Sequence, residues 1–205
     1  MIHMKSDQLP SFLKAKEIND GIAVEIGTWD GDFSFELLKH CNFKKVYCID
    51  PYEHFIDNSY MDGMNMLLQS DFDKKFSDVK KRFEHFGDRV IFLRMKSEEA
   101  SKLFEDNSID FVYIDGNHDY EFVKKDIENW FPKVKSGGIC AGDDVYSRDL
   151  NEHDVKGNIV RIWEYDTNNK PYCWGMYGTY KALVDCSKTM NYSYTLDQTQ
   201  FIIQK

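Results

Sequence analysis

The stretch from residue 109 to residue 144 constrains the fold more than any other part of the chain. An apolar run at 109–114 ends on Asp115, a helix-like segment follows, and a second apolar run ends on the pair Asp143-Asp144. Strand, helix and strand in this order predict a right-handed crossover between two parallel strands. Both strands then end at one edge of a sheet, which is the edge where open parallel sheets bind ligands.

The same alternation of strands and helices runs through the rest of the chain. Short apolar runs bounded by turn residues predict strands, and apolar residues spaced by three and four predict helices. We expect strands at 22–26, 45–49, 89–95, 110–114 and 138–142. We expect a turn at 19–21 and helices at 7–17, 33–41, 65–86, 97–104 and 178–190, with a further helix around Val123, Ile127 and Trp130. The first helix should bury Leu9, Phe12 and Leu13 on one face.

The C-terminal end of the chain has a different pattern. Two short strands, at 192–196 and 200–203, flank a three-residue connection that predicts a hairpin. Together these elements indicate an α/β fold with a doubly wound, mostly parallel seven-stranded sheet and a C-terminal antiparallel hairpin. At 205 residues the chain is one domain. Within it we expect an N-terminal helical cap at 1–20, a lid over the cofactor at 51–86 and an acceptor-side region at 145–180.

Composition excludes several classes of partner. The chain has 26 Lys and Arg against 35 Asp and Glu, a net charge of −9, which argues against nucleic acid. It has neither an apolar run long enough to span a membrane nor the apolar core of a signal peptide at its start. Five cysteines form no Cys-x-x-Cys motif, which favours a reducing cytoplasm with Cys48 and Cys140 as buried free thiols.

The loop after the first strand reads Glu25-Ile-Gly27-Thr28-Trp-Asp-Gly31. Its glycines let the backbone turn tightly and approach a ligand, but their spacing is neither that of a dinucleotide fingerprint nor that of a phosphate loop. The loop lacks basic residues for a phosphate, and its acids attract a cation. The ligand we expect has ribose, adenine and a positive centre but no phosphate, which describes S-adenosylmethionine.

Two residues beyond this loop complete the predicted donor site. Asp50 ends the second strand, where a carboxylate accepts hydrogen bonds from both ribose hydroxyls. Ser97 follows the third strand and is placed to bond an adenine edge. The Glu-x-Gly-x-x-x-Gly loop, the acid after the second strand and the terminal hairpin resemble class I S-adenosylmethionine-dependent methyltransferases. That resemblance implies that the cofactor is held by Glu25, Gly27, Thr28, Gly31, Asp50, Ser97 and Asp115.

A second site is predicted at the ends of the fourth and fifth strands. Asp115, Asp143 and Asp144 offer carboxylate oxygens, the ligands that Mg²⁺ and similar divalent cations prefer. Without a cation the three acids would repel one another, and at least one would hold a proton. His118 stands three residues after Asp115 and has an ordinary pKa near 6.5, which suits a general base at neutral pH. The plain structural alternative is a turn-capping Asp144 beside a solvent-facing Asp115.

The motif Tyr113-Ile-Asp115-Gly-Asn-His118, followed by Gly137-Gly138 and Gly142-Asp143-Asp144, is similar to the macrocin O-methyltransferase and cephalosporin-hydroxylase-like group. More distantly it resembles catechol O-methyltransferase, and the resemblance covers about 22–144. It implies that Asp115, Asp143 and Asp144 bind Mg²⁺ and that His118 is the general base, with Asp115 also catalytic. Relatives can carry Glu where this chain has Asp143.

We therefore expect an enzyme that methylates a hydroxyl of a sugar, glycoside or glycan with help from a divalent cation. A metal-independent O- or N-methyltransferase and a non-catalytic module that binds S-adenosylmethionine remain open, as does a homo-oligomer. Aromatic residues beside the metal site are expected to contact either the acceptor or the protein core: Tyr146, Trp163, Tyr165, Tyr172, Trp174 and Tyr177.

Overall fold

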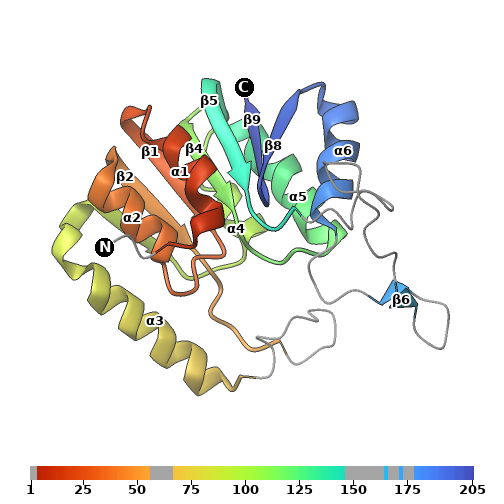
Figure 1. Ribbon diagram of the computed structural model, residues 1–205. Coiled ribbons are helices and arrows are strands. Elements are labelled where there is room, and N and C mark those ends of the chain that lie inside the picture. Colours follow the sequence, from red (N-terminus) through yellow and green to blue (C-terminus); the bar gives the residue numbers. More distant parts are fainter. Residues whose placement is uncertain (1–3, 56–66, 146–163, 166–170, 173–177) are drawn as a thin grey trace.

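The computed structural model describes residues 4–55, 67–145, 164–165, 171–172 and 178–205, and the sheet at its centre confirms the predicted fold class. Seven strands lie in the order β3-β2-β1-β4-β5-β9-β8 (Figure 1). The strands β1 to β5 pair in parallel, β9 runs antiparallel to β5, and β8 completes the edge as the hairpin partner of β9. Their bounds are β1 Asn19–Ile26, β2 Asn42–Ile49, β3 Val90–Leu93, β4 Ile109–Ile114, β5 Val134–Gly142, β8 Tyr194–Asp197 and β9 Gln200–Gln204.

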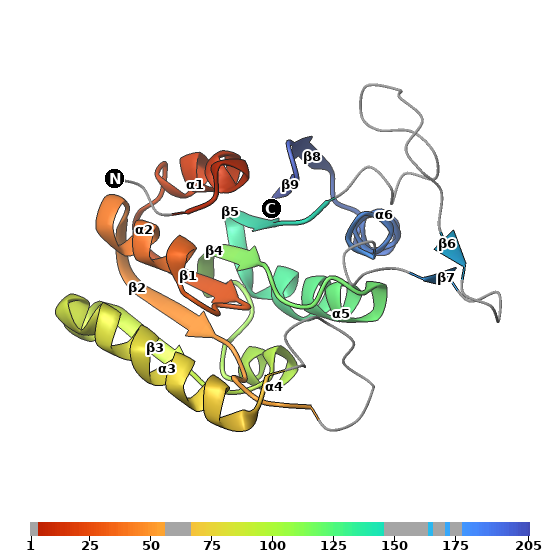
Figure 2. The ribbon, with the colours of Figure 1, turned by 60° about the horizontal axis from the view of Figure 1, so that its bottom comes forward.

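The described helices cover both faces of this sheet (Figure 2). One face is covered by α1 Leu9–Ala15, α2 Asp32–His40 and α3 Gln69–Phe83, and the other by α4 Ser97–Ser101, α5 Tyr120–Trp130 and α6 Thr179–Met190. Short 3₁₀ segments lie at Ser6–Gln8, Glu84–Arg89 and Phe131–Lys133, and two short strands, β6 Glu164–Tyr165 and β7 Pro171–Tyr172, pair outside the main sheet.

The strand sequences supply a separate apolar core to each face. Successive side chains of a strand point to opposite sides of the sheet. In β4, Val112 and Ile114 therefore join the core beneath α4, α5 and α6, while Phe111 and Tyr113 join the core beneath α1, α2 and α3. The Tyr113 ring stacks on Phe33 of α2 at 3.9 Å between ring centroids. A strand that is apolar on both sides is the pattern of a parallel sheet covered twice.

Near the N-terminus the structure differs from two predictions, one on the start of the first strand and one on the buried face of the first helix. Residues 19–21, predicted as a turn, belong to β1, where a bulge and a left-handed Asp20 (φ 54°) absorb the turn residues. The first helix buries Phe12 and Ala15, whereas Leu9 and Leu13 are 38% and 52% exposed. The reason is that α1 packs on β5 and β9 with Ser11, Phe12 and Ala15 buried, so that Leu9 and Leu13 lie on its other side.

Two expected regions, the lid at 51–86 and the acceptor-side region at 145–180, are only partly described. The described part of 51–86 includes α3, which is the crossover helix between β2 and β3, and residues 56–66 lie outside the description. Most of 145–180 also lies outside it, including the side chains of all six aromatic residues expected near the acceptor.

Among the described helices none is long and apolar enough to cross a membrane. Cys41, Cys48, Cys140 and Cys186 are free and buried.

Candidate active site

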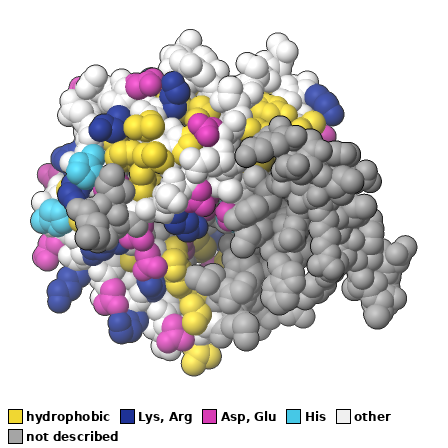
Figure 3. Space-filling model, in the orientation of Figure 1, with side chains coloured by type: hydrophobic (Ala, Val, Ile, Leu, Met, Phe, Trp, Pro, Cys, Tyr) yellow, Lys and Arg dark blue, Asp and Glu magenta, His cyan; other side chains and the backbone are white. Residues whose placement is uncertain are grey.

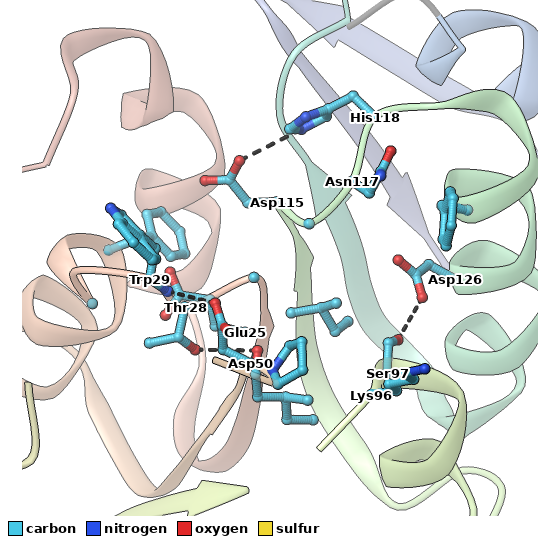
Figure 4. Close-up of a pocket in the computed structure, with 18 of the residues that line it drawn as sticks. Glu25, Thr28, Trp29, Asp50, Lys96, Ser97, Asp115, Asn117, His118 and Asp126 are labelled. Atoms are coloured by element: carbon cyan, nitrogen blue, oxygen red, sulfur yellow. Dashed lines mark hydrogen bonds and ion pairs between the residues drawn. The ribbon is translucent and has the colours of Figure 1, made fainter. Parts of the chain in front are cut away.

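A pocket of about 1030 Å³ opens at the carboxyl ends of β1, β2 and β4, where the strand order reverses. Such a reversal separates the loops of neighbouring strands and leaves a crevice for ligands. All the predicted site residues line this pocket except Asp143. Figure 4 shows Asp50, Asp126 and the Asp115–His118 pair at three separate corners of the pocket.

The glycine loop after β1 brings the backbone against β4. Gly27 has a left-handed backbone (φ 83°), and a Cβ there would lie 2.1 Å from the carbonyl oxygen of Asp115. Its N–H donates to the carbonyl of Ile49 in β2 at 2.9 Å. Gly31, also left-handed (φ 73°), stands at the N-terminus of α2. The two glycines are therefore required by close approach and by backbone conformation, as the sequence predicts.

Asp50 anchors this loop to the end of β2. Its carboxylate accepts hydrogen bonds from the backbone N–H groups of Trp29 at 2.9 Å and of Tyr52 at 2.8 Å. The Tyr52 hydroxyl donates to the Trp29 carbonyl at 2.7 Å. Trp29 and Tyr52 both have φ 43°, a strained conformation for large side chains. Strain of this kind persists where surrounding contacts enforce it and concentrates at functional sites.

Glu25 is a buried acid beneath the glycine loop. It is 2% exposed, and the hydroxyl of Ser34 donates to it. Burial raises the pKa of Glu25 to about 8, and the nearby Asp115 and Asp50 add to the rise. The carboxyl is therefore largely protonated at neutral pH until a cationic group enters the pocket.

We expect Glu25→Gln to change how stability depends on pH. The folded pKa of about 8 lies above the unfolded value near 4.3, so the unfolded chain loses this proton first and stability falls between those pH values. Glutamine removes that loss. The variant should exceed wild type by roughly 3 kcal/mol in free energy of unfolding at pH 8 and by much less at pH 5.

Urea denaturation at the two pH values measures this difference, and groups that titrate in both proteins cancel from it. Glu17→Gln, at an exposed position after α1, is the matched control and should show neither effect. An advantage of the Glu25 variant that is equal at both pH values would contradict the account.

Three side chains at the ends of β4 and β5 form a compact cluster. One ligand atom each from Asp115, His118 and Asp144 lies within 4.8 Å of the others. The Nε2 of His118 is 3.6 Å from Asp115 Oδ1 and 3.5 Å from Asp144 Oδ2. Burial opposes a charge on His118, but Asp115, Asp144 and Asp143 together raise its pKa above the usual value. Asp144 has a left-handed backbone (φ 57°), with its side chain in this cluster.

Asp143 lies outside this cluster, although the sequence predicts it as a metal ligand together with Asp115 and Asp144. Its Oδ1 accepts from Gln200 Nε2, from Thr199 Oγ1 at 2.9 Å and from the Asp144 N–H at 2.7 Å. Burial, with Asp115 and Asp144 nearby, raises the pKa of Asp143 to about 7. Its Oδ2 is buried without a hydrogen-bond partner among the described residues. Gln200 in turn accepts from Ser11 of α1 and from Tyr113, so α1 is tied to this strand end.

These residues fit a divalent cation. Two carboxylates and an imidazole converge, and the His118 Nε2 is buried without a hydrogen bond to any described group. Buried polar atoms without partners are rare and call for an explanation such as an ion. Two close carboxylates also repel each other unless a cation or a proton lies between them.

Four polar residues of the pocket have partners that sequence reasoning did not predict, and three of the four were not predicted at all. Ser97, predicted at the adenine edge, lines the pocket but is bonded to Asp126 and to the Trp130 indole. Gln8 donates to Asp115 Oδ2 at 3.1 Å from the N-terminal segment, which no local pattern indicates. Asn117 and Asp126 line the pocket and are each 6% exposed. For Asp126 a signal exists, because it lies on the same helical face as Val123, Ile127 and Trp130.

Comparison with known proteins identifies the class of this fold and site. A family model for a methyltransferase domain matches residues 24–145, well over half of the chain. The chain therefore belongs to this family of methyltransferase domains. The matched residues include the glycine loop, Asp50 and the whole Asp115–Asp144 region. This membership supports S-adenosylmethionine as the methyl donor of the chain.

Solved structures share the fold over almost the whole chain. A protein from Streptococcus mutans assigned as a methyltransferase, solved with S-adenosylhomocysteine, superposes with a TM-score of 0.58 at 11% identity, covering 98% of this chain and 97% of that one. A protein from Staphylococcus aureus assigned as a caffeoyl-CoA O-methyltransferase gives 0.60 at 17%, covering 97% and 82%. The O-methyltransferase NovP gives 0.60 at 16%, covering 97% and 79%.

One sequence relative matches a short stretch. Over 73 residues the chain is 34% identical to the uncharacterized protein y4gI of Sinorhizobium fredii. The stretch makes up 36% of this chain and 7% of that protein. The chain thus corresponds to a small part of this relative.

Proposed function

We propose that the chain transfers a methyl group from S-adenosylmethionine to a hydroxyl oxygen of a sugar, glycoside or glycan, with the help of Mg²⁺ or a similar divalent cation. The observation that carries the proposal is the Asp115–His118–Asp144 cluster, which lines the same pocket as the glycine loop and Asp50. A methyl donor and a deprotonated oxygen acceptor would meet at that cluster. Kinship with the macrocin O-methyltransferase group is part of the proposal.

In this account the donor half of the pocket is built by β1 and β2. Asp50 receives the ribose hydroxyls, and the glycine loop passes close under the methionine portion. Glu25 and Asp115 supply negative charge for the sulfonium and ammonium groups, which favours the cationic donor over its neutral sulfur product. Protein residues need not form a covalent intermediate, because the sulfonium already carries a good leaving group.

The acceptor half is the cluster itself. Asp115 and Asp144 would hold the cation. When bound, a divalent cation makes a coordinated hydroxyl more acidic and fixes its position. His118 is the proposed base: a cation on Asp115 and Asp144 would offset the negative charge that raises its pKa, and the neutral Nε2 facing them would then take the hydroxyl proton. Alignment of oxygen, methyl carbon and sulfur then accounts for much of the rate.

The acceptor class rests on chemistry and on surface charge. A sugar hydroxyl has a high pKa and needs this combination of cation and base, and neighbouring hydroxyls of a sugar can chelate one ion. On the face shown in Figure 3, acidic and basic side chains are mixed, and the net charge is −9, which supports a small or glycan acceptor over a nucleic acid.

Methyl transfer to a panel of diols and glycosides, with and without chelator, tests the proposal. We expect transfer from S-adenosylmethionine in the presence of Mg²⁺, loss of at least about 100-fold in EDTA, and recovery when Mg²⁺ is restored. Undiminished transfer after complete chelation would contradict the role of the cation and favour a metal-independent O- or N-methyltransferase. Binding of S-adenosylhomocysteine without any transfer would favour a non-catalytic module.

A further inference from the structure

Asp126 is a buried acid of the pocket to which the proposed reaction gives no role. It projects from α5 into the corner of the pocket away from both Asp50 and the Asp115–His118 pair (Figure 4). The residue is 6% exposed and sits within the apolar face of its helix. Burying a carboxyl there is costly unless each oxygen has a partner. A ligand that binds in the pocket can supply the hydrogen-bond donor that an oxygen of Asp126 lacks.

The hydrogen bonds of Asp126 have a fixed direction. The indole Nε1 of Trp130 can only donate, and it donates to Ser97 Oγ at 2.8 Å. The Ser97 hydroxyl proton is therefore free to point to Asp126, and Ser97 donates to Asp126 Oδ1. The other oxygen, Oδ2, lies beside Gly116, 3.8 Å from where a Cβ on that glycine would sit. Ser97 thus orients Asp126 and has no proton left for a base.

Asn117 provides a donor next to this acceptor. Its Oδ1 accepts from the Asp119 N–H at 2.8 Å, which fixes the orientation of the amide. Its Nδ2 is buried and finds no hydrogen-bond partner in the described part of the chain. Asn117 follows Gly116 directly and lines the same pocket. An acceptor on Asp126 and a donor on Asn117 therefore flank Gly116.

We propose that Asp126 sets the base specificity of the pocket: its Oδ2 accepts a hydrogen bond from the exocyclic amino group of adenine, and Asn117 Nδ2 donates to the adjacent ring nitrogen. Adenine presents an amino donor beside a ring-nitrogen acceptor, whereas a 6-oxo purine presents an acceptor in place of the amino group. The inference rests on the proposed donor, since a ribose at Asp50 and a methyl group at the cluster leave the Asp126 corner for the base.

Calorimetric titration with S-adenosylhomocysteine and its 6-oxo analogue, S-inosylhomocysteine, tests this. Burial raises the pKa of Asp126 to about 7, so pH 8 keeps its carboxylate mostly ionised. Wild type should bind the adenine compound about 10- to 100-fold more tightly than the 6-oxo analogue. In Asp126→Asn, Ser97 still donates to the amide oxygen, so the amide nitrogen faces the base. The preference should disappear or reverse.

The matched control is Glu128→Gln, which removes an acid from an exposed position of the same helix and should keep the wild-type preference. Equal affinity of wild type for the two compounds would overturn the inference even if Asp126→Asn fails to fold. An unchanged preference in a folded Asp126→Asn would do the same. If wild type binds neither compound, the donor assignment itself fails, and the inference fails with it.

Discussion

Asp144→Asn should lower methyl transfer on the order of 10³-fold while S-adenosylhomocysteine affinity changes less than about threefold. Asparagine keeps the size of the side chain and tolerates the left-handed backbone found at this position (φ 57°). It also keeps the N–H that donates to Asp143. What it removes is one of the negative charges of the cluster. Because Asp144 is not one of the residues expected to contact the donor, the affinity for the product analogue is largely spared.

The comparison that isolates this effect uses Asp197→Asn, at an exposed position at the end of β8. Both variants lose one carboxylate, and only the cluster variant should lose transfer. Initial rates at saturating donor and calorimetric affinities measure the two halves of the site separately. Loss of donor binding together with transfer in Asp144→Asn would show that the cluster does not act as a separate acceptor half.

Gly27→Ala is expected to destabilise the protein by about 2–5 kcal/mol and to weaken donor binding at least tenfold. A Cβ at this position would lie 2.1 Å from the carbonyl oxygen of Asp115 and 2.6 Å from the Cα of Gly116, both backbone atoms of the strand-end loop. Neither atom can move without separating β1 from β4. The left-handed φ of 83° adds strain for alanine.

Gly87→Ala is the control for this prediction, because Gly87 also has a positive φ (56°) but a Cβ there meets nothing within 4 Å. It should cost about 1–3 kcal/mol, the strain of the backbone alone, and less than Gly27→Ala. Chemical denaturation of both variants separates steric contact from strain. Equal losses of stability in the two variants would contradict the close approach of the glycine loop to β4.

The parts of the fold that follow from local patterns were predictable. The alternation of strands and helices requires only periodicity, and the terminal hairpin follows from its two short strands, so the sheet was confirmed with the antiparallel hairpin in place. Element ends were less accurate: the bulge in β1 turns Asp20 and Gly21 into strand residues, and whether Leu9 is buried depends on how α1 lies against the sheet.

In the site too, some residues follow from local sequence patterns and others depend on contacts between distant segments. Residues at strand ends, such as Asp50 and Asp115, follow from the rule that parallel strands end at one edge. Their partners do not, because hydrogen bonds between distant segments decide them. Ser97 accepts a hydrogen bond from Trp130, 33 residues later, and Asp143 is held by Gln200, 57 residues later. The acid on the apolar face of α5 was visible in the sequence as an exception to its periodicity.

A crystal structure with S-adenosylhomocysteine and Mn²⁺, whose anomalous scattering locates the ion, tests the two-part site most directly. The account predicts ribose on Asp50, the sulfur next to Asp115, and an ion bound by the carboxylates of Asp115 and Asp144, with His118 facing the open acceptor position. An ion held elsewhere, or a nucleoside placed away from Asp50, would contradict it.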